Sequence, residues 1–263
     1  MALKICVVGN SHVGALKFGW ENIRSSHRHE LTFLGVPGTS VRDLTVEHGI
    51  VLPTTNTARK FFLKTSGSEG IALDSYDVVL LVGAGLTLTS ALSLTNRWRP
   101  YGLVDETIRD SQSQFNLVSD QLFAELISSR VRKSFANRLL RKVTRQSAVR
   151  ALYVTTPLPS SELRLARSDD PVLSLIAGTH GPSIASLYRN SLERVMGKDK
   201  VIFPPAHALV DGAMTDARYS RGSLRLDGER EHPDTDLNHM NAAYGALVLE
   251  EVFNRLGSAT SSR

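Results

Sequence analysis

The strongest constraint on the fold is a set of short, almost wholly apolar segments that end beside glycine or proline. Residues 3–9 (LKICVVG) and 77–82 (DVVLLV) are rich in valine, isoleucine and leucine, without alternating polar positions. Such segments are typical of strands that are buried on both faces of a parallel sheet. Residues 31–36, 151–155 and 201–203 have a similar character. Helical stretches lie between these segments, so the sequence predicts an α/β protein with helices on both faces of a parallel sheet.

The length favours one large domain. A chain of 263 residues, of which 41% are hydrophobic, can bury a sizeable core without dividing. We expect a single domain over residues 1–256 with a helical insertion at about 86–150, followed by a small, polar, flexible tail at 257–263. Residues 86–150 and 204–238 form unusually long connections, and such connections are often lids or loops that carry a site.

Other local signals are weaker. A helix is expected over about residues 13–25, although Gly14 and Gly19 lower its helical propensity. Apolar residues at helical spacing predict a last helix over about 240–255. The apolar run Phe61, Phe62 and Leu63 predicts a short strand, and residues 65–70 then form a turn.

The charge and the cysteine content limit the partners and the cellular compartment that we expect for this protein. The formal net charge of +5 is too small to indicate a nucleic-acid partner by itself. Cys6 is the single cysteine, so no intramolecular disulfide is possible and a reducing compartment is expected. No apolar run approaches the roughly 18–20 residues of a transmembrane helix, and the chain runs directly from Met1 into a strand without the regions of a signal peptide. We therefore expect a cytoplasmic protein.

The turn after the first strand, in VVGNSHVGALKFG (residues 7–19), resembles a ligand-binding turn. Gly9 and Gly14 have the glycine spacing of a Walker phosphate loop, but Ala15 and Leu16 stand where lysine and a hydroxyl residue are needed. A dinucleotide fingerprint requires glycine at position 11, which is serine. Neither phosphate motif is complete, so no cofactor is expected.

Ser11 has two interpretations. It lies between a strand and a helix at the carboxyl edge of the predicted sheet, where open α/β sheets bind their ligands. Backbone N–H groups at the start of a helix can stabilise an oxyanion, which suits a nucleophilic serine. A serine that caps the helix is the common alternative.

A nucleophilic serine needs a base, and His239 is the informative histidine. It precedes the last predicted helix, and Asp234 and Asp236 lie five and three residues before it. Asp236 can orient one imidazole nitrogen while the other faces Ser11. His12 is adjacent to Ser11 in sequence, and we expect its side chain to point elsewhere. The alternative is a histidine at a helix start beside a capping aspartate.

Taken together, these segments resemble the SGNH (GDSL-type) hydrolase family. The similarity extends in order over most of the chain, in residues 9–12 (GNSH), 36–44 (VPGTSVRDL), 77–83 (DVVLLVG), 155–159 (TTPLP) and 236–239 (DLNH), followed by Asn241, Tyr244 and Gly245. The resemblance implies a three-layer α/β/α sandwich with a mostly parallel, flavodoxin-like five-stranded sheet. It also implies a serine hydrolase that cleaves a carboxylic ester, such as an O-acyl group on a carbohydrate.

The resemblance further implies roles for individual residues. Ser11 is the expected nucleophile, His239 the base and Asp236 its orienting acid, and the N–H groups of Ser11 and Gly38 are oxyanion donors. Two positions depart from the family pattern. Asn10 replaces the usual aspartate, and Gly85 stands where the family has an oxyanion asparagine. Thr87 or Asn238 is a candidate replacement donor. The expected substrate contacts are Asn10, Thr87, Trp98 and Asn238.

Four alternatives remain open. An O-acyltransferase can use the same triad, and a non-catalytic member of the fold can hold a glycan or another ligand in the same cleft. His232, Asp234, Asp236 and His239 are all possible metal ligands, but their spacing matches no strong metal motif, and no metal is expected. Residues 130–150 carry eight cationic side chains and no acidic one. This basic segment has an apolar stripe (Val131, Phe135, Leu139, Val143), which either packs on the core or belongs to a helix that binds an anionic polymer.

Overall fold

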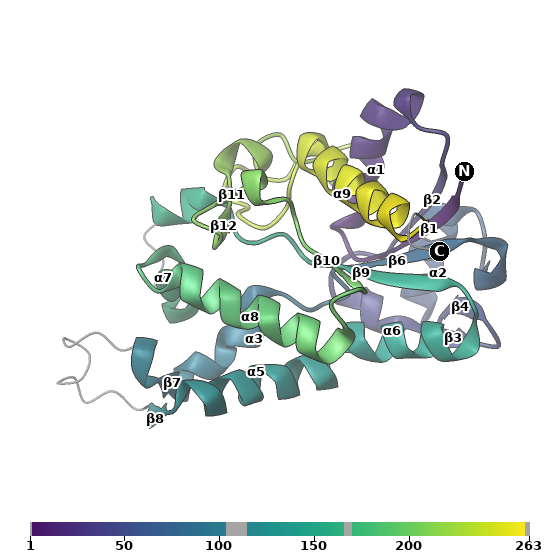
Figure 1. The fold of residues 1–263 in the computed structure, drawn as a ribbon. Helices are drawn as coiled ribbons and strands as arrows, with labels where there is room; N and C mark the ends of the chain where they lie inside the picture. Colours follow the sequence, from purple (N-terminus) through teal and green to yellow (C-terminus); the bar gives the residue numbers. More distant parts are fainter. Residues whose placement is uncertain (1, 104–114, 166–169, 261–263) are drawn as a thin grey trace.

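The protein is built around one five-stranded sheet. The computed structural model describes residues 2–103, 115–165 and 170–260. The strand order is β10-β9-β6-β1-β2, and all neighbouring strands are parallel (Figure 1). These strands are β1 (Lys4–Gly9), β2 (Glu30–Gly35), β6 (Val78–Val82), β9 (Arg150–Val154) and β10 (Val201–Ile202). The five predicted strands are confirmed, and counted along the chain they have the doubly wound order 2-1-3-4-5.

Helices pack on both faces of this sheet (Figure 1). Alternate residues of β1 belong to two separate apolar cores: Ile5 and Val7 lie in one, and Cys6 and Val8 in the other. The first core contains α1 (Val13–Ile23) and α9 (Ala242–Thr260). The second core is covered by α2 (Asn56–Ser66), α3 (Leu88–Leu92), α5 (Asp120–Lys133), α6 (Phe135–Gln146), α7 (Pro171–Ala177) and α8 (Gly181–Met196). The chain is therefore an α/β protein with a sheet between two helical layers.

The close approach of α1 and α9 depends on two glycines. A Cβ atom on Gly19 would lie 2.3 Å from the backbone nitrogen of Ala246, and one on Gly245 would lie 1.7 Å from the carbonyl oxygen of Ala15. Glycine at position 19 lowers helical propensity, but it lets the two backbones come into contact. Because Ser11 and His239 lie just before these helices, this packing brings their two segments together.

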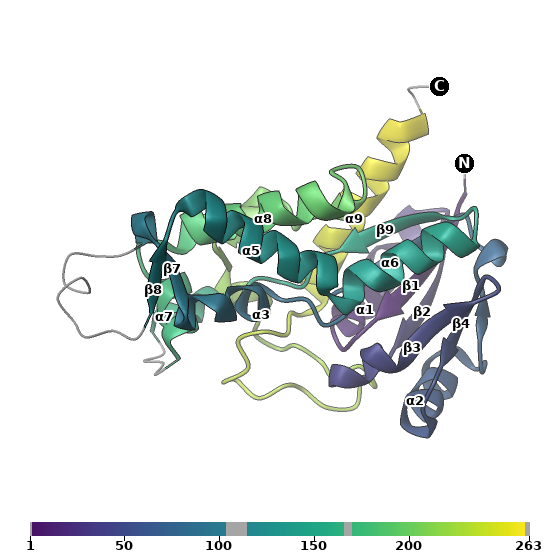
Figure 2. The same cartoon turned by 90° about the horizontal axis from the view of Figure 1, so that it is seen from below.

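The connection between β6 and β9 is largely helical in its described part. Besides α3, α5 and α6, it contains the parallel pair β7 (Trp98–Pro100) and β8 (Asn116–Val118). The basic segment is not one helix, because α5 ends and α6 begins at Ser134, whose extended backbone breaks the helix (Figure 2). The Ser134 hydroxyl accepts from the N–H of Asn137 and so caps α6. The stripe residues Val131, Leu139 and Val143 are buried in the second core.

The strand predicted at Phe61–Leu63 is wrong. These residues lie within α2, which the Thr55 side chain caps and which ends at Gly67 in the left-handed conformation. Only Phe62 is buried, while Phe61 and Leu63 are exposed. Helix α2 connects two strands of a small antiparallel sheet. The sequence did not indicate this sheet, which is formed by β3 (Leu44–Glu47), β4 (Ile50–Pro53) and β5 (Ile71–Ala72).

The last helix differs from its prediction at both ends. It begins at Ala242 rather than 240 and continues to Thr260, so residues 257–260 of the predicted flexible tail are helical. Residues 261–263 lie outside the described part. The remaining short pair is β11 (Leu209–Val210) with β12 (Met214–Thr215). Among the described residues, every helix is too short or too polar to cross a bilayer; the cytoplasmic location stays a prediction.

Candidate active site

Ser11, His239 and Asp236 form a continuous chain of hydrogen bonds. The Ser11 Oγ lies 2.8 Å from Nε2 of His239, and Nδ1 of His239 lies 2.7 Å from Oδ2 of Asp236. Residues that are 228 positions apart are thus in direct contact. Each imidazole nitrogen faces one partner, which is the arrangement required for a base that removes the serine proton and is oriented by a carboxylate.

The turn after β1 presents Ser11. The N–H of Val13 donates to the carbonyl of Asn10, and the N–H of Gly14 donates to that of Ser11. Helix α1 has no side-chain cap, so the capping role considered for Ser11 does not occur. The Asn10 side chain is buried beside Gly83, where a Cβ atom would lie only 2.8 Å from Asn10 Oδ1. Asn10 therefore packs under the turn and supports it.

A turn closed on Asp236 presents His239. The Asp236 Oδ1 accepts from the N–H groups of Asn238 and His239, while its Oδ2 accepts from the imidazole. Burial alone would raise the pKa of Asp236, but these hydrogen bonds outweigh it and hold the pKa well below its ordinary value. Asp236 is thus an ionised carboxylate at neutral pH.

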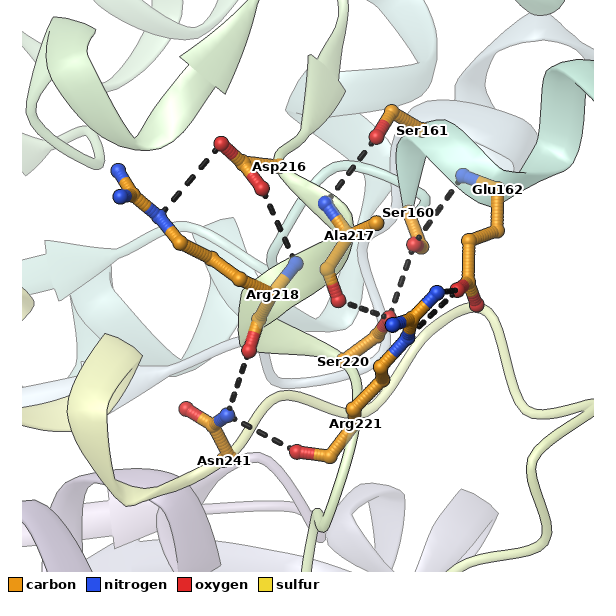
Figure 3. Close-up of polar contacts among 9 residues, drawn as sticks. All are labelled: Ser160, Ser161, Glu162, Asp216, Ala217, Arg218, Ser220, Arg221 and Asn241. Atoms are coloured by element: carbon orange, nitrogen blue, oxygen red, sulfur yellow. Dashed lines mark hydrogen bonds and ion pairs between the residues drawn. The ribbon is translucent and has the colours of Figure 1, made fainter.

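Polar contacts join the segment after β9 to residues 216–221 and join these to Asn241, which follows this turn (Figure 3). The N–H of Ser160 donates to the carbonyl of Leu237 at 2.7 Å, and the Ser160 hydroxyl lies 2.9 Å from that of Ser220. The amide of Asn241 donates to the carbonyls of Arg218 and Arg221, both at 2.9 Å. These bonds fix Leu237 and Asn241 on either side of His239, so the position of His239 does not depend on helix α9 alone.

Two more histidines stack on His239. The ring of His232 lies 3.9 Å from it and is nearly parallel, and the ring of His12 lies at 5.0 Å. The prediction that His12 points elsewhere is therefore wrong. Burial, with the charge of His239 nearby, lowers the pKa of His12 to about 3, and the same two causes lower the pKa of His232. Both flanking imidazoles are therefore neutral at pH 7, which avoids like charges around His239.

His232, Asp236 and His239 also form the one cluster of possible metal ligands in the described chain, with one ligand atom from each within 4.8 Å of the others. Asp234, the fourth residue considered from the sequence, is exposed and does not belong to it. The Nδ1 atoms of His232 and His239 lie 3.2 and 2.7 Å from the same Asp236 oxygen. The His239 contact is a hydrogen bond and the His232 contact is within ion-pair distance, and a metal ion between these atoms would have to replace both contacts.

Ser11 and Gly38, whose backbone N–H groups were expected to be donors, line the same cavity. No hydrogen bond from the N–H of Ser11 or Gly38 is found within the described chain. Gly38 has a φ of +53° and begins the short helix η2 (Gly38–Asp43). Gly85, where the resemblance to SGNH hydrolases leads one to expect an asparagine, has a φ of +73°. The atom nearest to a Cβ on Gly85 is Nε of Arg42, at 3.7 Å, so a guanidinium lies where an amide would project.

The other sequence candidates have different surroundings. The Thr87 hydroxyl caps α3 by accepting from the N–H of Ser90. Asn238 is exposed, and Trp98 packs against the second core from β7. None of these, nor Asn10, lines the cavity that contains Ser11. The structure therefore brings Ser11, Gly38, Asp236 and His239 together and leaves Thr87, Trp98 and Asn238 outside this group.

The cavity beside Ser11 has a volume of about 540 Å³. Much of its wall consists of residues that sequence reasoning missed: Lys17, Pro37, Phe61, Lys64, Thr65, Arg225, Leu226, Asp227 and Arg230. Three of them belong to α2, which was assigned wrongly. The residues from 225 onward lie in the long connection after β10, whose length was the one available signal of a site-bearing loop.

No family model matches the chain, and no curated protein matches its sequence.

Proposed function

We propose that this protein is a serine hydrolase of the SGNH type that cleaves a carboxylic ester. The observation that carries the proposal is the unbroken path from Ser11 Oγ through His239 to Asp236, with both contacts below 3 Å. A hydroxyl is a weak nucleophile unless a base removes its proton as it attacks. This geometry supplies the base, its orientation and the carboxylate that stabilises the imidazolium.

In the proposed reaction Ser11 attacks the ester carbonyl and His239 Nε2 accepts the serine proton. His239 then donates that proton to the departing alcohol, leaving an acyl group on Ser11. Water attacks the acyl group with His239 again as the base, which releases the acid and restores the serine. The ionised Asp236 stays hydrogen-bonded to Nδ1 and offsets the positive charge that His239 carries in both steps.

The proposed oxyanion donors are the backbone N–H groups of Ser11 and Gly38, joined by the Arg42 guanidinium in place of the missing asparagine. Two facts support Arg42. Its Nε occupies the space beside Gly85, and its side chain has no ion pair or hydrogen bond to another described residue. A positive charge held near the developing oxyanion stabilises the transition state.

Labelling with a fluorophosphonate tests the proposal directly, because such reagents modify serines that a base activates. We expect one adduct, on the peptide that contains Ser11, and its loss in Ser11→Ala. Ser25→Ala, which removes an exposed serine beyond α1, is the matched control and should keep the adduct. We also expect hydrolysis of 4-nitrophenyl acetate that depends on Ser11. An unlabelled Ser11, together with equal inertness of wild type and Ser11→Ala toward a broad ester panel, would refute the proposal.

Two alternative functions are compatible with this site. An O-acyltransferase would pass the acyl group to an alcohol other than water, and adding acceptor alcohols to the assay would then yield new esters. A non-catalytic ligand-binding protein is favoured by one observation, the glycine at position 85. That function predicts ligand binding without any fluorophosphonate adduct.

A further inference from the structure

The cavity beside Ser11 has an excess of positive charge. Four cationic side chains line it, Lys17, Lys64, Arg225 and Arg230, against the single carboxylate of Asp227. Lys64 lies 3.9 Å from Glu229, but both side chains are exposed and solvent screens the pair. Within the described chain, the charged groups of Lys17, Arg225 and Arg230 have no ion pair or hydrogen bond. These three cations are available to a ligand.

The two arginines are held side by side by a tight hairpin, residues 224–231. Leu224 pairs with Glu231, and the N–H of Arg225 donates to the carbonyl of Arg230 at 2.8 Å. The N–H of Gly228 closes the turn by donating to the carbonyl of Arg225, also at 2.8 Å. The arginines are therefore cross-strand neighbours, and both line the cavity.

This hairpin is anchored to α1, which follows Ser11, and to β2, the neighbour of β1 in the sheet. The Leu226 side chain packs so closely over Gly35, at the end of β2, that a Cβ there would lie 2.5 Å from its Cδ2. At the tip, Gly228 packs on the Phe18 ring of α1. An anchored wall loses little entropy when a ligand binds, which favours affinity.

We propose that the substrate is an anionic ester, in which a carboxylate, sulfate or phosphate group is held by the cationic wall while Ser11 attacks the ester carbonyl. This inference rests on the proposed hydrolase function. Guanidinium groups bind such anions through two parallel hydrogen bonds. Pro37, Phe61 and Leu226 add apolar surface, and the volume of about 540 Å³ lies within the usual range of small-ligand sites. An acylated acidic sugar has this combination of charge, size and ester.

The first test compares kcat/KM for two matched pairs of esters, each rate divided by that of alkaline hydrolysis. One pair places the charge on the alcohol (3-carboxyphenyl acetate against phenyl acetate), and the other places it on the acid (monophenyl succinate against phenyl butanoate). We expect the wild type to favour an anionic ester at least tenfold in one pair. The Arg225→Gln/Arg230→Gln variant should reduce this preference at least tenfold, and Lys17→Met, on a different element, should also reduce it.

The matched control is Arg59→Gln/Lys60→Gln. It removes the same charge from exposed positions of α2 that do not line the cavity, and it should leave the preference within twofold of the wild type.

The second test is independent of turnover. Sodium glucuronate and glucose are titrated into Ser11→Ala by calorimetry, with and without the two arginine substitutions. Arginine-dependent binding of glucuronate, weakened by added salt, supports the anion site. If no ester is cleaved at the same time, the hydrolase proposal fails and the site is one that binds an anionic ligand. If esters are cleaved but neither test shows an arginine-dependent preference for the charged probe, the anionic-substrate inference is overturned and the hydrolase proposal stands.

Discussion

The two halves of the candidate site are built differently. The proton-transfer half consists of side chains in direct contact, Ser11, His239 and Asp236. The proposed oxyanion half consists of backbone N–H groups, a glycine at position 85 and the exposed Arg42. A proton moves only between atoms at hydrogen-bond distance, so the first half has little freedom to change. An oxyanion needs charge or a donor at the right place, which different chain segments can supply.

The largest expected effect is the loss of the proton-transfer half. Ser11→Ala should lower kcat/KM for ester hydrolysis by at least about 10⁴-fold, because the nucleophile is gone. Asp236→Asn should cost roughly 10⁴-fold, because the amide cannot hold the required imidazole tautomer. Steady-state kinetics on 4-nitrophenyl acetate measure both.

Asp234→Asn is the matched control for the carboxylate, since Asp234 is exposed and lies outside the triad. It should stay within threefold of the wild type. A loss in Asp234→Asn as large as that in Asp236→Asn would mean that Asp236 has no special role.

A substitution in the oxyanion half should lower the activity less, and a second substitution should restore part of it. Arg42→Gln is expected to lower kcat by roughly 10²-fold, the usual cost of one lost donor. Adding Gly85→Asn in the same chain should recover at least tenfold, because asparagine tolerates a positive φ and its Cβ would fit in ordinary contact distance. Gly85→Ala, which adds a Cβ without a donor, should recover nothing.

If Arg42→Gln changes kcat by less than twofold, the guanidinium is not a donor. The oxyanion half then consists of the two backbone N–H groups alone. Measuring kcat and KM separately distinguishes this case from a role of Arg42 in substrate binding, which would appear in KM.

A smaller effect is expected on stability, from the neutral histidines that flank the triad. The pKa of His12 is lowered to about 3 in the folded protein, whereas its ordinary value is 6.5. Between these values the unfolded chain binds a proton that the folded protein does not, so the free energy of unfolding falls as the pH falls below about 6.5. The upper limit for one such group is about 1.4 kcal/mol per pH unit.

His12→Gln should flatten this dependence in urea unfolding curves measured between pH 4 and 6.5. His207→Gln, which removes an exposed histidine, should not. The lowered pKa of His232 also makes the free energy of unfolding fall as the pH falls. The lowered pKa of Asp236 has this effect only below its ordinary pKa of 3.8, which is outside the measured range. An unchanged slope in His12→Gln would show that His12 is not buried in its neutral form.

The smallest expected effect is that of metal removal. If His239 is the base, its Nε2 contacts Ser11 and needs no metal ion. Treatment with EDTA should then leave the rate of ester hydrolysis within twofold of the untreated protein. A loss that added Zn²⁺ restores would assign His232, Asp236 and His239 to a metal site instead. That result would overturn the comparison of the two halves, because the residues assigned to proton transfer would then be metal ligands.

Local sequence patterns predicted the strands of the sheet and the three residues that form the hydrogen-bonded chain, Ser11, His239 and Asp236. The run at residues 77–82 is apolar at successive positions, which a strand buried on both faces requires and which β6 confirms. Spacing also indicated that Asp236 can reach back to His239. The run at Phe61–Leu63 misled the assignment because three apolar residues fit a strand or a helix equally well. Its helical state depends on the Thr55 cap and on Gly67, which lie outside the apolar run itself.

Only the tertiary structure decided how the segments meet. The contact between Ser11 and His239 depends on the crossing of α1 and α9 at Gly19 and Gly245, and no local pattern specifies a crossing of two helices. The histidine stack, Arg42 beside Gly85 and the cationic wall likewise join residues that are far apart in the chain. Periodicity and capping act over a few residues, whereas a site is defined by distances between segments that packing alone brings together.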